Sequence, residues 1–343
     1  MIDSIVREDS QKIRDSLGKT AFEGKRVLVP GGAGFVGSWI CQVLVDLDAE
    51  VVCLDNLSTG KKSNVDYLRD RRNFRFVEGD VCTFREESSF GCILHLASRA
   101  SPVEYQQHPI ETLQANSVGS YNILETARKY DAKILFASTS EVYGDAEVVP
   151  TPESYWGNVN PVGVRSCYDE GKRFGEALFM AYNRQYGLDV RIARIFNTYG
   201  PRLRAEGAYG RVVSRFVTQA LSSQPLTVYG DGRQTRAFCY VTDTATGLLS
   251  LLTAERARGE IINLGNPVEM PILELAETVK RLARSVSPIT FHPLPSDDPK
   301  RRCPDISKAQ KLLGWKPKIS HEQGLTRTIE WFKANEMREK THD

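Results

Sequence analysis

Two groups of residues have the types and spacing needed for acid–base chemistry on an alcohol. Residues 138–141, Ser-Thr-Ser-Glu, place three hydroxyls beside a carboxylate, and Tyr168 and Lys172 follow at a spacing of four. On a helix this spacing puts Tyr168 and Lys172 on one face. A lysine beside a tyrosine lowers the tyrosine pKa from its ordinary value of about 10, so we predict that Tyr168 is a base near neutral pH. Because Tyr-x-x-x-Lys is common by chance, its meaning depends on the elements around it.

The elements that must position these residues are strands and helices of a nucleotide-binding fold. An apolar run at 134–137 predicts a buried strand that ends at the hydroxyl group, and residues 166–186 predict the helix that carries Tyr168. Far upstream, a strand at 26–30 leads into glycines at 31, 34 and 37 and an apolar helix at 39–47. Strand, glycine turn and helix are the context of a dinucleotide fingerprint, in which the helix N-terminus faces the pyrophosphate. The alternative is an ordinary glycine-rich loop.

The strand that follows the glycine turn supports a dinucleotide site over an ordinary glycine-rich loop. Residues 50–55 end in Asp55, 18 residues after Gly37, close to the usual spacing of about 20. A carboxylate there accepts hydrogen bonds from ribose hydroxyls and repels a 2′-phosphate, which predicts NAD rather than NADP, although Lys61 and Lys62 oppose that preference. The predicted cofactor-binding residues are Gly31, Gly34, Phe35, Val36, Gly37, Asp55, Asn56, Asp80, Val81, Leu96, Ala97, Ser98, Tyr168 and Lys172.

The alternation of strands and helices predicts an α/β fold with a Rossmann, doubly wound parallel sheet. Further strands are expected at 74–80, 92–97 and 188–196, and a long helix at 109–130. After residue 200 the alternation breaks, with helices expected at 212–221, 243–252, 272–283 and 306–314 and strands at 225–232 and 260–264. We therefore expect an N-terminal helical arm at 1–23, a dinucleotide domain at 24–200 plus 234–264, and a smaller C-terminal substrate-binding lobe at 201–233 plus 265–335.

Composition excludes several classes of function. The 343 residues carry a net charge of +2, which gives no reason to expect nucleic acid as a partner. No run approaches the roughly 20 apolar residues of a membrane span, and the polar residues 1–23 do not read as a secretory signal. The 7 cysteines form no Cys-x-x-Cys pair and the 5 histidines do not cluster with them, so we expect reduced thiols in a cytoplasmic setting and no metal.

Five motifs together resemble the extended short-chain dehydrogenase/reductase superfamily, its NAD-dependent epimerase/dehydratase family, and within that the UDP-glucuronic acid decarboxylases. The motifs are ASTSEVYG at 137–144, YWGNVNP at 155–161, RSCYDEGKR at 165–173, QTRAF at 234–238 and DPKRR at 298–302. The resemblance covers roughly residues 25–331. Two residues depart from the family pattern: Pro30 stands where a threonine is usual, and Arg99 where proline is common.

The resemblance implies an NAD-dependent decarboxylation of UDP-glucuronate to UDP-xylose through a 4-keto intermediate, with the cofactor recycled. Glu141 is then the candidate acid/base, and the neutral Ser140 stands where related 4,6-dehydratases carry an acid. Arg236 would contact the substrate carboxylate or the diphosphate. The implied catalytic residues are Thr139, Ser140, Glu141, Tyr168, Lys172 and Arg236. The implied substrate-binding residues are Asn197, Tyr229, Arg236, Arg301 and Arg302.

Several points stay open. Arg301 and Arg302 are expected on the diphosphate, whereas Tyr229 either stacks on uracil or packs in the core. Trp156 belongs either to a loop over the sugar or to the core. Glu176 is expected at the helix surface or in a homodimer contact, because the family dimerises through two helices near 110–130 and 166–186. Another uronate substrate, a 4-epimerase, a 4,6-dehydratase and a catalytically silent nucleotide-binding protein of the same fold are the alternatives.

Overall fold

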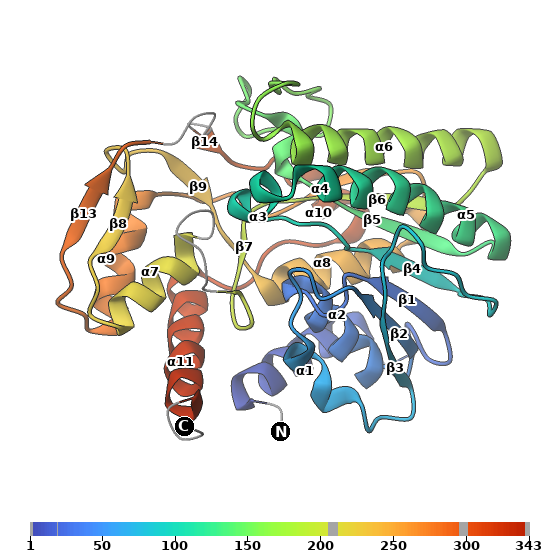
Figure 1. The fold of residues 1–343 in the computed structure, drawn as a ribbon, viewed down its shortest axis with the longest axis horizontal. Helices are drawn as coiled ribbons and strands as arrows, with labels where there is room; N and C mark the ends of the chain where they lie inside the picture. The colour runs from blue at the N-terminus through green and yellow to red at the C-terminus, as the bar shows by residue number, and fades with distance from the viewer. Residues whose placement is uncertain (1–2, 19, 205–211, 295–300, 340–343) are drawn as a thin grey trace.

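A seven-stranded parallel sheet forms the centre of the protein (Figure 1). The computed structural model describes residues 3–18, 20–204, 212–294 and 301–339. The strand order is β11-β6-β5-β4-β1-β2-β3, so the order reverses between β1 and β4, where ligands bind in open α/β sheets. The doubly wound prediction is confirmed. The strands are β1 (Arg26–Pro30), β2 (Glu50–Asp55), β3 (Phe74–Glu78), β4 (Cys92–His95), β5 (Lys133–Thr139), β6 (Val190–Ile195) and β11 (Ile261–Leu264).

Continuous apolar runs form these strands because both faces of the sheet are covered. Alternate residues enter two separate cores: Val27 and Val51 pack in one, and Leu28 and Val52 in the other. The first face carries α1 (Ser4–Leu17), α2 (Phe35–Asp46) and α8 (Val241–Thr253). The second face carries α4 (Pro109–Gln114), the π-helical turn η3 (Ala115–Gly119), α5 (Ser120–Tyr130) and α6 (Ser166–Tyr186).

The predicted helix at 109–130 therefore contains a π-helical turn, a feature that is frequent at functional sites. Short 3₁₀ turns lie at η1 (Lys62–Asn64), η2 (Asp66–Leu68), η4 (Ser140–Tyr143) and η5 (Glu255–Ala257). The helix α3 (Pro102–Gln107) precedes α4, and the short parallel pair β7 (Thr198–Tyr199) and β10 (Cys239–Tyr240) lies between the sheet and the second lobe.

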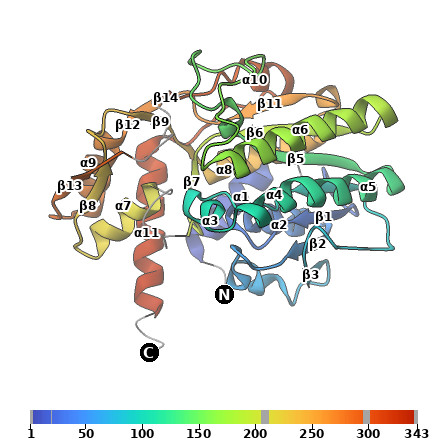
Figure 2. The same cartoon turned by 45° about the horizontal axis from the view of Figure 1, so that its top comes forward.

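The second lobe lies beside the carboxyl ends of the strands (Figure 2). Two small sheets, β8–β13 and β12–β9–β14, and three helices form most of its described part. Its elements are α7 (Val212–Leu221), β8 (Leu226–Tyr229), β9 (Thr235–Ala237), β12 (Glu269–Pro271), α9 (Ile272–Ala283), β13 (Ile289–His292), β14 (Arg301–Arg302) and α11 (His321–Glu339). The helix α10 (Ser307–Leu313) packs near β11 and α8 instead.

Sequence reasoning missed α11 altogether. Among its described side chains, the large apolar ones that are buried form a narrow stripe, Leu325, Ile329 and Phe332, between polar and charged residues, so its apolar periodicity is weak.

The N-terminal arm is helical as predicted, and it is part of the core. Asp9 on α1 is fully buried. It accepts a hydrogen bond from the Tyr240 hydroxyl at 2.6 Å and one from Arg327 Nε at 3.1 Å. Tyr240 lies on β10 and Arg327 on α11, so this one carboxylate joins α1 to the connection between the lobes and to the C-terminal helix.

Candidate active site

A cleft of about 1220 Å³ lies at the carboxyl ends of the central strands and extends to the second lobe. All fourteen predicted cofactor-binding residues line it. So do the other predicted site residues except Arg301, namely Thr139, Ser140, Glu141, Asn197, Tyr229, Arg236 and Arg302. The motif residues Asp298, Pro299 and Lys300 lie outside the described part of the chain. Among the described residues no group of three or more His, Cys, Asp or Glu side chains could hold a metal ion.

The glycine turn fits a dinucleotide closely. Gly31 has φ +81°, and a Cβ added there would lie 2.6 Å from the Ala97 nitrogen. A Cβ on Gly37 would lie 2.1 Å from the Gly31 carbonyl oxygen. Side chains are thus excluded where the turn packs tightly against Ala97 and against the start of α2, and α2 begins at Phe35 with its first turn at the cleft. This cradle is the form in which proteins bind a pyrophosphate.

Two aspartates stand where the adenosine half of the cofactor is expected. Asp55 accepts hydrogen bonds from the Ala33 nitrogen at 2.9 Å and the Leu57 nitrogen at 2.8 Å, and it thereby braces the glycine turn. Burial nevertheless raises the Asp55 pKa. Burial also acts to raise the Asp80 pKa, but hydrogen bonds from Cys82 and Asn56 outweigh it and lower that pKa. Both carboxylates line the cleft.

Tyr168 and Lys172 share a helical face as predicted, but the predicted effect on Tyr168 is wrong for the protein without ligand. Burial raises the Tyr168 pKa, although a hydrogen bond with Thr139 opposes the shift. Lys172 Nζ donates to the Ala137 carbonyl at 2.8 Å, and burial lowers the Lys172 pKa to about 7. Lys172 therefore loses its proton at a lower pH than Tyr168 does. The spacing of four residues did not predict this order, because it gives no measure of how strongly burial desolvates each side chain.

Glu141 lies in an ion-pair cluster. Arg302 contacts both carboxylate oxygens, with Nη2 at 2.8 Å from Oε2, and Arg165 pairs with the same carboxylate. Burial acts to raise the Glu141 pKa, but the charges of Arg302 and Arg165 outweigh it and lower the pKa to about 2. Glu141 is ionised at neutral pH in this state. Arg165 also faces Asp169 at 3.8 Å, where burial and the Glu141 charge raise the Asp169 pKa to about 7.

The two arginines of the DPKRR motif do not act together. Arg301 and Arg302 form the strand β14, so their side chains point to opposite faces. Arg302 is buried in the cleft, whereas Arg301 is mostly exposed and pairs with Glu269. Arg301 therefore does not line the cleft in this structure, and its expected contact with the diphosphate stays a prediction.

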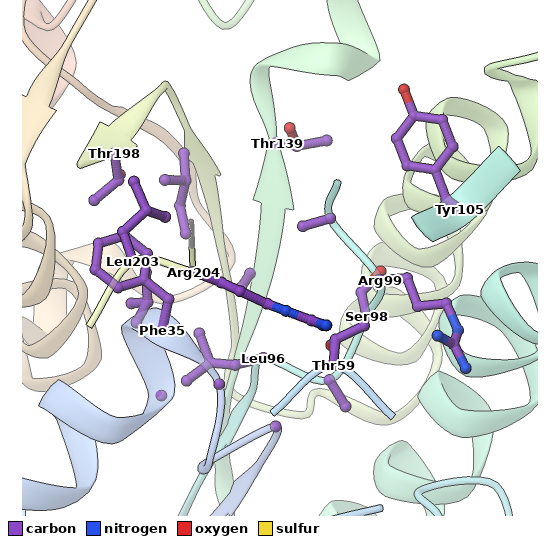
Figure 3. Close-up of a pocket in the computed structure, with 18 of the residues that line it drawn as sticks. Phe35, Thr59, Leu96, Ser98, Arg99, Tyr105, Thr139, Thr198, Leu203 and Arg204 are labelled. Atoms are coloured by element: carbon purple, nitrogen blue, oxygen red, sulfur yellow. The ribbon is translucent and has the colours of Figure 1, made fainter. Parts of the chain in front are cut away.

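Arg99, the departure from the family pattern, is accommodated by an ion pair. Glu104 on α3 lies 3.5 Å from Arg99 Nη1 and 3.2 Å from Arg204 Nη1. Figure 3 shows Arg204 extending from the Leu203 side of the cleft toward Ser98. Two guanidinium groups thus line the cofactor side of the cleft and share one carboxylate.

The structure locates Tyr229 and Trp156, the two aromatic residues whose positions the sequence left open. Tyr229 lines the cleft, with the Arg215 guanidinium 5.0 Å from its ring centroid. Trp156 neither lines the cleft nor packs in the core, since it is 89% exposed. Tyr105, which sequence reasoning missed, lines the cleft and stacks on Tyr168 with centroids 5.1 Å apart. Arg165 was missed as a site residue too, although the quoted RSCYDEGKR motif contains it.

Known proteins are similar to this chain in sequence and in fold. The profile of the NAD dependent epimerase/dehydratase family matches residues 27–265. UDP-glucuronic acid decarboxylase 1 of Danio rerio is 50% identical over 310 residues, which cover 90% of this chain and 72% of that protein. UDP-glucuronic acid decarboxylase 1 of Arabidopsis thaliana is 48% identical over 316 residues, 92% of this chain and 71% of the relative.

Solved structures of known enzymes are also similar to this chain in fold. The epimerase Mth375 of Methanothermobacter thermautotrophicus superposes with a TM-score of 0.86 at 31% identity, covering 96% of this chain and 97% of the other. The dTDP-glucose 4,6-dehydratase DesIV of Streptomyces venezuelae, solved with NAD bound, has a TM-score of 0.83 at 29% identity, covering 91% and 98%.

Proposed function

The chain belongs to the NAD dependent epimerase/dehydratase family, and we propose that it decarboxylates UDP-glucuronate to UDP-xylose, with NAD as a recycled cofactor. One observation carries the proposal: a single cleft holds a dinucleotide cradle, the Thr139–Tyr168–Lys172 group and a neutral residue at position 140. A 4,6-dehydratase must protonate a leaving hydroxyl at C6, and Ser140 is unsuited to that task. A serine also does not repel a uronate carboxylate.

The first step is oxidation of the sugar at C4. Thr139 and Tyr168 hydrogen-bond the 4-oxygen, and Tyr168 takes the hydroxyl proton. When bound, NAD⁺ accepts the hydride and brings a positive charge to the cleft, which favours the Tyr168 phenolate. Lys172 holds the tyrosine and the ribose side of the cofactor. The product of this step is a ketone at C4 with the C5 carboxylate in the β position.

Decarboxylation follows from that arrangement. The C5–carboxylate bond breaks, carbon dioxide leaves, and the bonding electrons pass into an enolate at C4. The protonated Tyr168 and Thr139 donate hydrogen bonds to the developing oxyanion. C5 then takes a proton supplied by solvent, C4 regains its hydride, and Tyr168 returns its proton to the 4-oxygen, so the net change is the uptake of one proton and the loss of carbon dioxide, with no net redox change.

We assign the arginines to the anionic parts of the substrate. Guanidinium groups pair bidentately with carboxylates and phosphates, which suits Arg236 for the sugar carboxylate or the diphosphate and Arg302 for the diphosphate. Glu141 is the assigned acid/base near C5. Its ionised state in the free protein favours a start as base or as an anchor for Arg302. Asn197, at the end of the dinucleotide domain, and Tyr229, in the proposed nucleotide-sugar lobe of residues 201–233 plus 265–335, complete the nucleotide side.

We further propose that the chain is a homodimer through α4–α5 and α6. These helices lie side by side (Figure 1), and α4 and α6 are in contact. Large apolar side chains are exposed on them, which is unusual for a surface without a partner. The exposed residues are Ile110, Leu113, Val118, Tyr121, Phe174 and Tyr186. Light scattering should give twice the chain mass, and Tyr121→Glu should reduce it.

A cytoplasmic location is also a proposal. All seven cysteines are free thiols, as a reducing compartment allows. Among the described residues, no helix combines the length and the apolar character that a bilayer crossing requires.

The decisive experiment is product analysis by mass spectrometry with a panel of nucleotide sugars. Only uronates should lose the mass of carbon dioxide, without net NADH, and UDP-glucuronate should be the best substrate. Tyr168→Phe should abolish turnover and keep NAD bound. An isomerised UDP-glucose or a dehydrated product would favour an epimerase or a dehydratase instead, and no reaction with any sugar would favour a silent binding protein.

A further inference from the structure

A carboxylate that the proposed reaction does not use is buried behind the Tyr168–Lys172 pair. Glu176 is 7% exposed, although it was expected at the helix surface or in a homodimer contact. Its Oε1 accepts hydrogen bonds from Ser138 Oγ at 2.6 Å and Arg194 Nε at 2.9 Å. Its Oε2 accepts from Arg194 Nη2 at 2.7 Å. Ser138 and Arg194 are buried as well, so all three polar groups are removed from water and satisfied by one another.

Sheet register and helix packing create this contact. Ser138 on β5 and Arg194 on β6 are directly paired, so their side chains lie next to each other on one face of the sheet. The helix α6 lies close above them, since a Cβ added to Gly175 would be 2.5 Å from the Phe136 ring. Glu176 therefore fixes α6 against the C-terminal end of the strand β5. Thr139, the next residue of that strand, carries the hydroxyl that meets Tyr168.

Glu176 also lies one helical turn beyond Lys172, on the same face of α6. Lys172 is 2% exposed, and the Glu176 charge opposes the fall in the Lys172 pKa that burial causes. Two other titratable groups face Lys172: the Lys172 charge acts on the pKa of His95 on β4, and Lys172 Nζ lies 5.9 Å from the centroid of the Tyr168 ring. His95 is neutral because burial and the Lys172 charge lower its pKa to about 3, and burial likewise keeps Tyr168 neutral. Arg194 is bound to Glu176 itself. Glu176 thus supplies the negative charge that faces Lys172.

We propose that Glu176 is a positioning residue for the Tyr168–Lys172 pair: held by Arg194 and Ser138, its carboxylate places a negative charge one helical turn from Lys172 and locks α6 to the end of β5. The electrostatic part concerns the protein alone. The consequence for turnover rests on the proposed function, because it requires that the charged Lys172 supports oxidation at C4.

The test measures the Lys172 charge directly. Protein labelled with ¹³C at the lysine ε-carbons is titrated by NMR, and the signal absent from Lys172→Met identifies Lys172. The wild type should titrate near pH 7. In Glu176→Gln the midpoint should fall by about one pH unit or more, because a negative charge near the ammonium is lost. Glu176→Asp keeps the charge and should restore a midpoint close to that of the wild type.

Turnover of UDP-glucuronate by the NAD-loaded enzyme supplies the second readout. The alkaline limb of kcat/KM should move to lower pH in Glu176→Gln by the same amount as the NMR midpoint, and Glu176→Asp should move it back. If Glu176→Gln does not fold because Arg194 is left unpaired, Glu176→Gln/Arg194→Met removes both charges and should still lower the midpoint, by less than Glu176→Gln would, because the repulsion from an unpaired Arg194 is removed as well.

The outcomes separate the two ideas. An unchanged Lys172 midpoint in folded Glu176→Gln or in the double variant overturns the positioning role, even if stability falls. A shifted midpoint with an unshifted alkaline limb overturns the role in turnover. A shifted midpoint in a protein whose wild type converts no nucleotide sugar supports the charge relation and refutes the proposed function.

Discussion

Removing the Glu141 carboxylate should destabilise the protein by an amount that depends on pH. In the folded state the Glu141 pKa falls from 4.5 to about 2, because Arg302 and Arg165 outweigh the effect of burial. At 1.36 kcal/mol per unit, this shift corresponds to about 3 kcal/mol at pH 7. Breaking a buried pair from one side costs about 3 to 5 kcal/mol in other proteins, which agrees with this value. We therefore expect Glu141→Gln to lose about 3 kcal/mol of unfolding free energy at pH 7.

The direction of the Glu141 pKa shift determines how its contribution to stability changes with pH. A carboxyl group whose pKa is depressed by folding stabilises the protein fully above its unfolded pKa, and this contribution is lost as the pH falls through the folded value. For Glu141 the window runs from 4.5 down to about 2. The difference between wild type and Glu141→Gln should be constant from pH 6 to 8 and smaller by roughly 1 kcal/mol at pH 4.

Urea unfolding followed by circular dichroism at pH 7, 5 and 4 measures these differences. Glu147→Gln is the matched control, because Glu147 is exposed in the loop just beyond the site. In a double-mutant cycle with Arg302→Met, the Glu141 and Arg302 substitutions should cost less together than the sum of their separate effects. A loss at pH 7 below about 1 kcal/mol, or a difference that grows toward pH 4, would refute the reasoning.

Three further predictions use other described contacts. Arg302→Met should raise the KM for UDP-glucuronate at least about tenfold, whereas Arg301→Met, on the opposite face of β14, should change it less than about twofold; equal effects in steady-state kinetics would contradict the strand alternation. Asp9→Asn should cost about 3 kcal/mol in urea unfolding because it leaves Arg327 with a weaker partner, and the exposed Asp15→Asn should be neutral; equal losses would argue against the α1 contact. Removing NAD should raise the pKa of Tyr168, as read from the difference in ultraviolet phenolate absorbance between wild type and Tyr168→Phe; the same pKa with and without cofactor would exclude the electrostatic help proposed above.

Local patterns predicted the fold and the lining of the cleft because both depend on short-range rules. Buried parallel strands read as apolar runs, and a switch point places their carboxyl ends together, so Gly31, Asp55 and Thr139 were brought to one cleft as expected. The helix α11 escaped because its buried stripe is narrow. The order of the strands was enough to predict which residues line the cleft, whereas a weakly amphipathic helix such as α11 could not be predicted from the sequence pattern.

The charge states depend on distances that no local pattern contains. Glu141 meets arginines 24 and 161 residues away, and these partners decide that its pKa falls although it is buried. Tyr168 has its expected lysine on the same helical face, yet burial raises its pKa. Each pKa rises or falls according to whether desolvation or pairing with neighbouring charges has the larger effect. Only the complete arrangement of the cleft determines which effect is larger.

Glu176 is the instructive intermediate case, because its signal was present in the sequence and was read as surface. It continues the i, i+4 series of Tyr168 and Lys172, and a series that carries two buried catalytic candidates predicts burial for its third member. Arg194 lies in the buried strand β6, where only it and Arg191 are charged, and a charged residue in a buried strand is itself a sign of a buried partner. Taken together, an acid on the buried stripe of the helix and a base inside the neighbouring strand predict a buried pair. Such a pair next to a reacting tyrosine is a reason to test for electrostatic positioning before assigning either residue to the surface.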